Sequence, residues 1–397
     1  MRHYRIDGIE IADGSPQWAK VLSDAFARKL RPLCLCKPDG VPMYIARLDG
    51  QHIVKRMPSS GASHDPVCAA YEPPYELSGL GPLLGDAIRV DDEKGMAALK
   101  LDFPLAKTGS RPAPTAETST SDTVKNVSKK LSLRALLHYL WQEGELTAWT
   151  SAWIGKRGWG KVRASLVDAG RRMSVSSGPL SEVLFVPEVF QPEEKAAIAA
   201  RRATEFAALA HSGAGKRKLK VLVGEVKEFA EARSGRRLIV KHMPDYPLVI
   251  EEETWKRLEK VFAPELAFWN ADQALHLVTI LTFGLNAAGL AVVEEMALMI
   301  VTENWIPFET AHELRLLERL ARLRRKSVKG LRFNLSPEKP VVSVTLPESR
   351  PDPVAMFIVP ADADETYEVE LVGMTEARPD MRVWVWRVNE GEMPGLP

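Results

Sequence analysis

The sequence predicts a multidomain α+β protein, and three observations lead to this prediction. A chain of 397 residues is longer than most single domains. Its content of 45% hydrophobic and 26% charged residues supports buried cores beneath a polar surface. Strand-like and helical patterns also follow one another along the chain. We expect a zinc-binding β module at residues 1–105, a linker at 106–130, a winged-helix-like domain at 131–190 and a C-terminal α/β domain at 191–397.

The N-terminal module carries all three cysteines of the chain, as Cys34-Leu-Cys36 and within His64-Asp-Pro-Val-Cys68. Three thiolates and one imidazole are a frequent ligand set for structural zinc, because they complete a tetrahedron and leave no position for a catalytic water. Turn-forming residues flank a strand-like run at residues 44–54, which is typical of a small β module. The sequence therefore predicts structural zinc as the cofactor, with Cys34, Cys36, His64 and Cys68 as its ligands.

Two other uses of the cysteines stay open. They can be buried free thiols, which pack as small hydrophobic side chains, or a redox-active or disulfide-bonded pair with a spare thiol. His52 is a competing imidazole, but its place in the middle of the strand-like run favours His64. Because the sequence shows no signal peptide, we expect a cytoplasmic protein whose reducing surroundings keep the thiols available for metal.

The predicted linker at residues 106–130 is rich in small polar residues and proline and has no apolar period. Such a composition cannot bury enough surface to fold alone. The linker should therefore separate the cysteine-bearing module from the rest of the chain.

One apolar segment has the length of a membrane span. Residues 274–293 carry no formal charge, but they include His276 and Asn286, and two glutamates follow directly. A turn at residues 284–289 between two buried segments explains this pattern, so we expect no membrane partner.

Residues 131–190 show the order of a winged-helix domain. Residues 132–149 repeat leucine at helical spacing until Gly144, a second amphipathic stretch covers residues 160–173, and residues 182–186 are strand-prone. Basic and aromatic residues alternate near the start of the second helix, where they suit contacts with phosphates and bases. The alternative is a small helical packing domain with a solvated basic face. The candidate nucleic-acid contacts here are Lys156, Arg157, Trp159, Lys161 and Arg163.

The C-terminal part alternates strand and helix patterns. Residues 218–227 and 237–242 read as strands and residues 252–262 as a helix, whereas residues 275–283 and 290–301 fit either strands or buried helices. An amphipathic helix then runs from Phe308 to about Arg325. Strands are expected at residues 332–334, 341–346 and 355–359. The candidate phosphate contacts around the basic helix are Arg315, Arg319, Arg322, Arg325, Lys326, Lys329 and Arg332.

Several motifs together resemble an uncharacterised bacterial family, domain of unknown function 1173. They are the two cysteine half-sites, Arg56-Met-Pro58, residues 137–141, residues 155–159, residues 304–308 and residues 329–334. The resemblance covers nearly the whole chain. It implies a role near DNA transfer or maintenance, because members are encoded on conjugative plasmids and integrating elements, but it brings no established activity.

Residues 308–359 are also similar to the restriction-endonuclease-like core of mobile-element nucleases. That core needs carboxylates on two adjacent strands to hold Mg²⁺. The corresponding runs here, residues 340–343 and 356–360, carry none, so the resemblance implies a degenerate core. Glu225-Val-Lys227 offers an acid-x-Lys pattern elsewhere, but any solvated strand can produce it. Glycine-rich nucleotide loops, Gly-x-Ser-x-Gly and His-Glu-x-x-His are also missing, so the protein is not expected to be an enzyme.

These observations lead to one functional hypothesis and two alternatives. We expect a zinc-stabilised nucleic-acid-binding accessory protein of a mobile or conjugative element, with DNA favoured over RNA. The alternatives are an active metal-dependent nuclease and a structural subunit that meets other proteins of the element.

Overall fold

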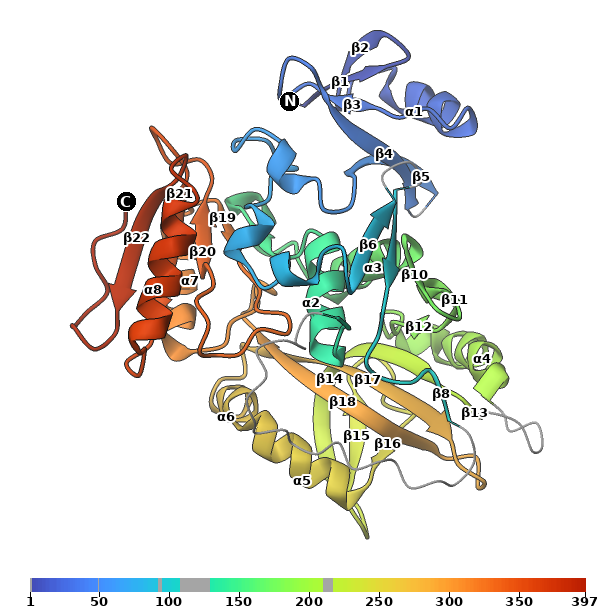
Figure 1. Ribbon diagram of the computed structural model, residues 1–397. Helices are drawn as coiled ribbons and strands as arrows, with labels where there is room; N and C mark the ends of the chain where they lie inside the picture. The colour runs from blue at the N-terminus through green and yellow to red at the C-terminus, as the bar shows by residue number, and fades with distance from the viewer. Residues whose placement is uncertain (1, 49, 92–94, 108–128, 210–216) are drawn as a thin grey trace. The chain divides into compact units, whose positions relative to one another are not determined.

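The computed structural model describes residues 2–48, 50–91, 95–107, 129–209 and 217–397 and shows a mixed α+β protein (Figure 1). Most of the predicted linker, residues 108–128, lies outside the described residues. The chain forms two compact units. We call Met1–Ala98, Thr147–Ser151 and Leu316–Pro397 the terminal unit, and Leu99–Leu146 and Ala152–Arg315 the central unit.

These units differ from the contiguous domains 1–105, 131–190 and 191–397 that the sequence suggests. The difference comes from strand pairing between distant segments, because β9 (Ala148–Trp149) pairs with β19 (Ser327–Lys329). Similarly, β12 (Leu184–Phe185) pairs with β14 (Lys220–Glu231) across the expected boundary at residue 190.

The N-terminal part of the terminal unit is an antiparallel sheet in the order β2-β1-β3-β4-β5. Its strands are β1 (His3–Ile6), β2 (Ile9–Ala12), β3 (Leu33–Cys34), β4 (Val41–Leu48) and β5 (Gln51–Arg56). Helix α1 (Trp18–Ala27) contributes Leu22 and Ala25 to the core of this sheet. The strand-like run at residues 44–54 is therefore a hairpin of two strands.

Short elements follow this sheet. They are the 3-10 helices η1 (Gly61–Ser63), η2 (Tyr75–Leu77) and η3 (Gly81–Leu83), and the paired strands β6 (Ile88–Asp91) and β7 (Met96–Leu99). Leu77 is buried with Val342 and Phe357, so this segment packs into the C-terminal part of the same unit.

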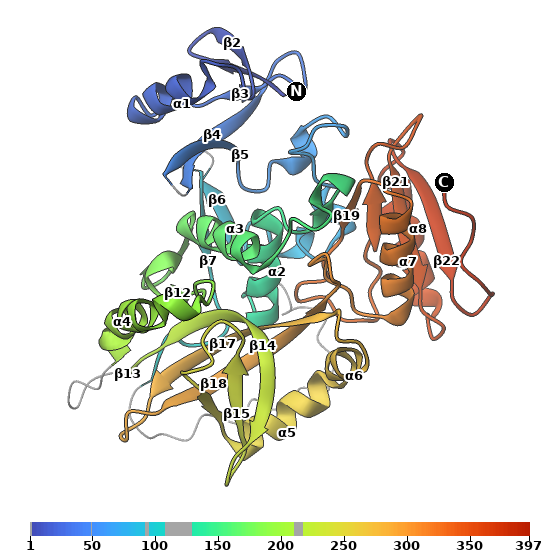
Figure 2. The same ribbon diagram turned by 180° about the vertical axis from the view of Figure 1, so that it is seen from behind.

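That C-terminal part is a sheet in the order β22-β21-β20-β19-β9. Strands β20 (Val344–Leu346) and β21 (Val354–Val359) are antiparallel, whereas β21 and β22 (Arg382–Arg387) are parallel and are joined through α8 (Glu365–Glu376). The side chain of Asp364 accepts the Tyr367 N–H at 2.8 Å and caps α8. Figures 1 and 2 place α7 and α8 on opposite faces of this sheet.

The strand expected at residues 332–334 is a turn, because Phe333 has a left-handed backbone (φ 53°) that strands exclude. The expected strand at 341–346 is shorter and covers only β20. Helix α7 (Ala311–Arg322) ends three residues earlier than the sequence suggests.

The central unit begins with helical elements. Helix α2 (Leu133–Glu143) is capped by Ser132, whose hydroxyl accepts the Ala135 N–H, and it ends at Gly144 as expected. The other elements are β8 (Ala106–Lys107) with β13 (Arg217–Lys218), η4 (Ser151–Trp153), α3 (Trp159–Arg171), the hairpin β10 (Met173–Val175) and β11 (Gly178–Pro179), η5 (Leu180–Glu182), η6 (Pro192–Glu194), α4 (Lys195–Phe206) and η7 (Ala207–Leu209).

The rest of the central unit is a closed barrel. Strand β14 pairs with β17 (His276–Leu285) through residues 220–225 and with β15 (Arg236–Val240) through residues 226–231. Strands β16 (Leu248–Ile250) and β18 (Ala291–Val301) complete the circle. Helices α5 (Glu252–Val261) and α6 (Ala263–Ala271) lie against β17 and β18 (Figures 1 and 2).

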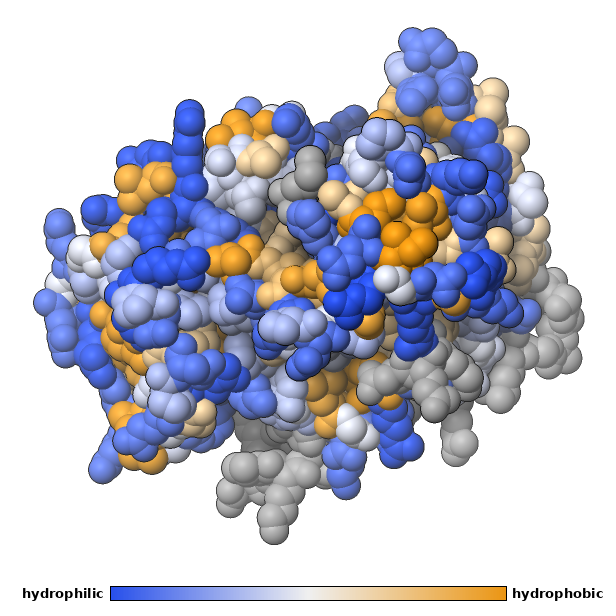
Figure 3. Space-filling view, turned by 90° about the horizontal axis from the view of Figure 1, so that it is seen from above, coloured by the Kyte–Doolittle hydropathy of each residue, from blue (hydrophilic) through white to orange (hydrophobic). Residues whose placement is uncertain are grey.

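The structure answers two questions from the sequence, which are the secondary structure of two apolar segments and the presence of a membrane-spanning helix. The segments around residues 275–283 and 290–301 are strands, and they are joined by a turn at residues 286–290. In the described part of the chain, every helix is too short or too polar to cross a bilayer. Hydrophilic side chains also cover most of the face in Figure 3, with apolar patches between them.

The β14–β15 turn gives a test of barrel closure. Gly235 (φ 73°) and Gly289 (φ 76°) have similar left-handed backbones, but a Cβ at Gly235 would lie 2.0 Å from the Ile250 carbonyl oxygen, whereas none of the described atoms lies within 4 Å at Gly289. Gly289→Ala should cost about 1–2 kcal/mol through backbone strain alone. Gly235→Ala should cost roughly 2 kcal/mol more, because backbone must also move. Denaturant unfolding of both variants measures the difference, and equal losses would contradict this account of the turn.

Candidate functional site

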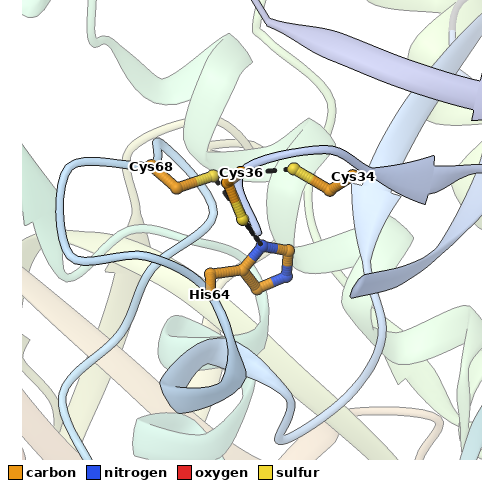
Figure 4. Close-up of side chains that lie close together, drawn as sticks. All are labelled: Cys34, Cys36, His64 and Cys68. Carbon is orange, nitrogen blue, oxygen red and sulfur yellow. Dashed lines mark hydrogen bonds between the residues drawn. The ribbon is translucent and has the colours of Figure 1, made fainter. Parts of the chain in front are cut away.

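Two loops of the terminal unit bring Cys34, Cys36, His64 and Cys68 together (Figure 4). Cys34 ends β3, and Cys36 lies in the turn that follows, before Gly40 leads into β4. Gly40 has a left-handed backbone (φ 77°), and a Cβ there would lie 2.9 Å from the side chain of Leu33. The Cys-x-Cys spacing therefore places both sulfurs on one tight turn between two strands.

The second loop holds His64 and Cys68. His64 directly follows η1, and the Cys68 N–H donates to the Asp65 carbonyl at 2.8 Å, while the Asp65 side chain accepts the Val67 N–H at 2.9 Å. Gly61 allows this loop to approach its neighbour, because a Cβ there would lie 2.5 Å from Cβ of Glu72. The three residues between His64 and Cys68 thus form one compact turn with its own hydrogen bonds.

The four ligand atoms lie within 4.8 Å of one another. Sγ of Cys34 is 3.8 Å from Sγ of Cys68, and Nδ1 of His64 is 3.3 Å from Sγ of Cys36 and 3.7 Å from Sγ of Cys68. A tetrahedral ion with bonds of about 2.3 Å to sulfur and about 2.0 Å to nitrogen would separate its ligand atoms by roughly 3.5–3.8 Å. The described atoms therefore already have metal-binding spacing.

The cysteines are free thiols, and a disulfide is excluded at the 3.8 Å separation of Cys34 and Cys68. His52, the competing imidazole, lies on β5 with its ring centroid 4.6 Å from that of Phe26 and is not among the four clustered residues. The structure thus selects His64, whose ring is 1% exposed. Its Nδ1 is the nitrogen that faces the sulfurs of Cys36 and Cys68. Within the described residues its Nε2 has no hydrogen-bond partner.

Burial opposes ionisation of three neighbouring thiols. The hydrogen bond between Cys34 and Cys68 raises the pKa of Cys34, and burial adds to this rise. The same bond outweighs burial at Cys68 and lowers its pKa to about 4, with further help from His64 and the Ala70 N–H. Burial also raises the pKa of Cys36. The metal-free cluster therefore favours a single thiolate, and a divalent cation would displace the remaining thiol protons.

The cluster is part of the protein core. Cys34 and Cys68 are buried with Tyr4, Leu22 and Met43. Such a closed, apolar setting suits a structural metal, because four protein ligands leave no position for water or substrate.

Lys326 ties the metal-site loop to the C-terminal part of the terminal unit. Its ammonium donates to the carbonyl oxygens of Val67 and Cys68 at 3.3 Å each and lies 3.4 Å from the Glu348 carboxylate. The Lys326 side chain is 11% exposed. A cation that is held by two carbonyls of the ligand loop stabilises that loop and the segment after α7 together.

Comparison with known proteins gives one result. Residues 4–389 match the family model described as "Protein of unknown function (DUF1173)". The chain belongs to the DUF1173 family. This confirms the family resemblance of its motifs, while no curated protein and no solved structure matches the chain.

In this DUF1173 protein, the candidate phosphate contacts fall into two groups. Arg319 and Arg322 are exposed on α7, on the side opposite the buried Leu316 and Leu320, and Arg315 is exposed one turn earlier on the same helix. Lys156 is also exposed.

The other candidates already have partners inside the protein. Lys329 is 6% exposed and donates to the Gly330 carbonyl. Arg325 donates to the Pro397 carbonyl and Ser349, and Arg332 donates to the carbonyls of Ser336 and Lys339.

The candidates near α3 behave similarly. Arg157 is 7% exposed and donates to the Leu146 carbonyl, and Trp159 is 5% exposed with its indole N–H on the Pro187 carbonyl. Arg163 donates to the Val186 carbonyl, and the Lys161 ammonium lies over the Trp153 ring at 5.6 Å.

A second polar cluster, around Glu225 of the central unit, is not visible in the sequence. The Glu225 carboxylate is 2.7 Å from Nδ1 of His276, 2.8 Å from Nζ of Lys241 and 3.7 Å from Nε2 of His242. These residues are scattered along the chain, and only barrel closure brings them together. Within the Glu225-Val-Lys227 pattern, the Glu225 carboxylate forms its ion pair with Lys241.

Two tryptophans cover this cluster. The His276 ring stacks on Trp305 at 4.1 Å, and the His242 ring stacks on Trp159 at 5.2 Å. Burial lowers the pKa of His242, and its Nδ1 accepts the Phe190 N–H at 3.3 Å. At Glu225 burial raises the pKa, but the hydrogen bonds from His276 and Lys241 outweigh it, so the pKa is lowered.

This cluster should stabilise the central unit above acid pH. Glu225→Gln should lower the free energy of unfolding at pH 7 by roughly 2 kcal/mol, because it leaves Lys241 and His276 without their anion. A carboxyl with a lowered folded pKa stabilises above its unfolded pKa of about 4.3, so the difference between wild type and variant should disappear as pH falls through the folded pKa. Urea unfolding from pH 3 to 7 measures both effects.

Glu228→Gln is the matched control, because Glu228 is exposed on the same strand. It should leave stability nearly unchanged at every pH. Equal effects of the two substitutions would contradict a stabilising role for the Glu225 cluster.

Proposed function

We propose that this chain is a nucleic-acid-binding protein whose terminal unit is held together by a structural zinc ion. The proposal has two parts, the metal and the nucleic acid. The metal part of the proposal rests on the closed set of three thiols and one imidazole at tetrahedral spacing.

Zinc fits these residues better than other common metals. Thiolate and imidazole are ligands that zinc prefers, whereas Mg²⁺ and Ca²⁺ require oxygen ligands. The buried position and the lack of a carboxylate among the four ligands support a closed structural site. When bound, the ion would supply cross-linking of the two loops and neutralise the thiolates.

The observation that supports nucleic-acid binding is the exposed guanidinium row of α7. Arg319 and Arg322 lie on its solvent-facing side, and the exposed acidic residue Glu318 directly precedes Arg319. The opposite side is buried through Leu316, Leu317 and Leu320. The helix is therefore fixed by packing while its arginines remain free to neutralise phosphates.

Two further features support the proposed class. The order α2, α3 and the hairpin β10–β11 supports the winged-helix-like comparison for residues 131–190. The family resemblance supports DNA of a mobile or conjugative element as the nucleic acid, and other proteins of that element as further partners.

The proposal assigns no hydrolysis to the C-terminal sheet. Strands β20 and β21 consist of Val-Thr-Leu and Val-Ala-Met-Phe-Ile-Val, which offer no carboxylate for Mg²⁺. Glu313 is buried, and its carboxylate accepts the Glu309 N–H at 2.8 Å at the start of α7, which suits a capping residue. These placements favour a degenerate nuclease-like core that binds without cutting.

The zinc proposal is tested by histidine replacement. Wild-type protein should contain about one equivalent of zinc, and His64→Gln and Cys36→Ser should lose most of it because three ligands bind zinc far more weakly than four. His52→Gln is the matched control and should keep the metal, since His52 is not among the four clustered residues. Elemental analysis of the purified proteins gives the result. Retention of zinc in His64→Gln, or folded wild type without zinc, would overturn the proposal.

The nucleic-acid proposal is tested on α7. Arg319→Ala with Arg322→Ala should weaken binding to duplexes of unrelated sequence and reduce the slope of log K against log salt by about 2, one unit for each lost phosphate contact. Lys20→Ala with Arg28→Ala is the control, because it removes two exposed cations near α1 instead. Unchanged affinity in the α7 pair across several salt concentrations would show that this helix face is merely solvated.

A further inference from the structure

The strand order of the central barrel belongs to a known architecture. In chain order the strands are β14, β15 and β16, then helices α5 and α6, then β17 and β18. Around the barrel they follow β14-β15-β16-β18-β17 and return to β14. Of the pairs between these five strands, β16 with β18 is parallel and the others are antiparallel. This five-stranded Greek-key barrel has the topology of the OB-fold.

The first strand of the barrel has the bend that this topology requires. Strand β14 must pair with two different strands, and its register shifts between Val226 and Glu228 where the partner changes. Gly224 lies just before this bulge, and a Cβ there would lie 2.8 Å from the Val240 side chain on the adjacent strand β15. A bulge and a glycine together let one long strand curve through both halves.

In OB-folds, oligonucleotides and oligosaccharides bind on the face of strands two and three, between the loops that join strands one to two and four to five. The equivalent face here is the outside of β15 and β16. The flanking loops are the turn at residues 232–235 and the turn at residues 286–290. Because fold alone does not decide function, the ligand must be inferred from the side chains on this face.

Side chains alternate along β15. Leu238 and Val240 are fully buried in the barrel, so Arg237 and Ile239 of the same strand point outward. Arg237 and Lys241 are exposed, and Ile239 is half-buried between them. On the neighbouring β16, Val249 is half-buried and lies opposite Arg237. The face thus combines the cation of Arg237 with two apolar side chains, while the Lys241 ammonium pairs with Glu225.

More cations surround this face. Arg233 is exposed in the turn at residues 232–235, and Lys227 is exposed at the bulge of β14. Together with Arg237 they outnumber the exposed acids Glu228 and Glu231 of β14, whereas Lys241 is neutralised by Glu225. Cations around half-buried apolar side chains complement a single strand, whose phosphates are anionic and whose bases offer apolar faces.

We propose that the outer face of β15 and β16, between the turns at residues 232–235 and 286–290, binds single-stranded nucleic acid. This site is separate from the α7 face, so it adds a second nucleic-acid contact to the proposed function and names its substrate class. Arg233 and Arg237 would contact phosphates, while Ile239 and Val249 would lie beneath the bases.

The test uses full-length protein and a fluorescently labelled oligothymidylate of about 15 nucleotides, near the upper site size of a single OB-fold. Arg233→Ala with Arg237→Ala should weaken binding roughly tenfold and reduce the salt slope by about 1.4, because each lost contact to a single strand contributes about 0.7. Lys256→Ala with Lys260→Ala removes two exposed cations from α5 and is the matched control, which should bind as wild type does. Unchanged thermal unfolding of both pairs verifies that the barrel stays folded.

The outcomes separate this inference from the proposed function. We call Arg233→Ala with Arg237→Ala the barrel pair and Arg319→Ala with Arg322→Ala the α7 pair. If the barrel pair binds oligothymidylate as wild type does, while the α7 pair loses duplex binding, the inference fails and the proposed function stands. If the barrel pair loses oligothymidylate binding while the α7 pair keeps its duplex affinity, the inference stands and the α7 contact of the proposed function fails. Binding of a neutral oligosaccharide to the wild type in place of oligothymidylate would also overturn the inference.

Discussion

The terminal unit depends on the meeting of four side chains, Cys34, Cys36, His64 and Cys68, inside its N-terminal core. The hydrogen bond to Cys68 and burial raise the pKa of Cys34, and burial raises the pKa of Cys36, so these two thiols resist ionisation. A divalent cation removes this conflict by replacing protons at the site. The loop that carries Cys68 also accepts two hydrogen bonds from Lys326, so a metal that orders the loop supports the C-terminal segment as well. The metal site and the tertiary contacts of the unit are therefore coupled.

The central unit follows a different constraint, which is closure of a small barrel. Strand β14 must serve two neighbours, and the bulge after Val226 together with Gly224 makes that bend possible. Closure has two consequences. It brings Lys241, His242 and His276 around the buried carboxylate of Glu225, and it leaves a cationic outer face on β15. Both consequences arise from strand pairing rather than from any local motif.

The sequence predicts elements well where the signal is local. The clustering of Cys34, Cys36, His64 and Cys68 could be predicted because their short spacings are typical of metal sites. Helix α2 is capped by Ser132 and ends at Gly144 as its pattern indicates. Distant pairings were not evident, because β9 and β19 are too short to carry a period. Arg332-Phe-Asn was wrongly predicted as a strand, since the left-handed backbone of Phe333 is set by its surroundings. Sequence also cannot distinguish the buried Lys329 from the exposed Arg319, because both lie in the same basic run.

The central claim is that a zinc ion with three sulfur ligands and one nitrogen ligand holds the terminal unit. X-ray absorption at the zinc edge of the wild-type protein tests it most directly, because the spectrum reports the type and number of ligand atoms. The account predicts three sulfur atoms at about 2.3 Å and one nitrogen at about 2.0 Å. A first shell dominated by oxygen or nitrogen, or five or six ligands, would contradict it.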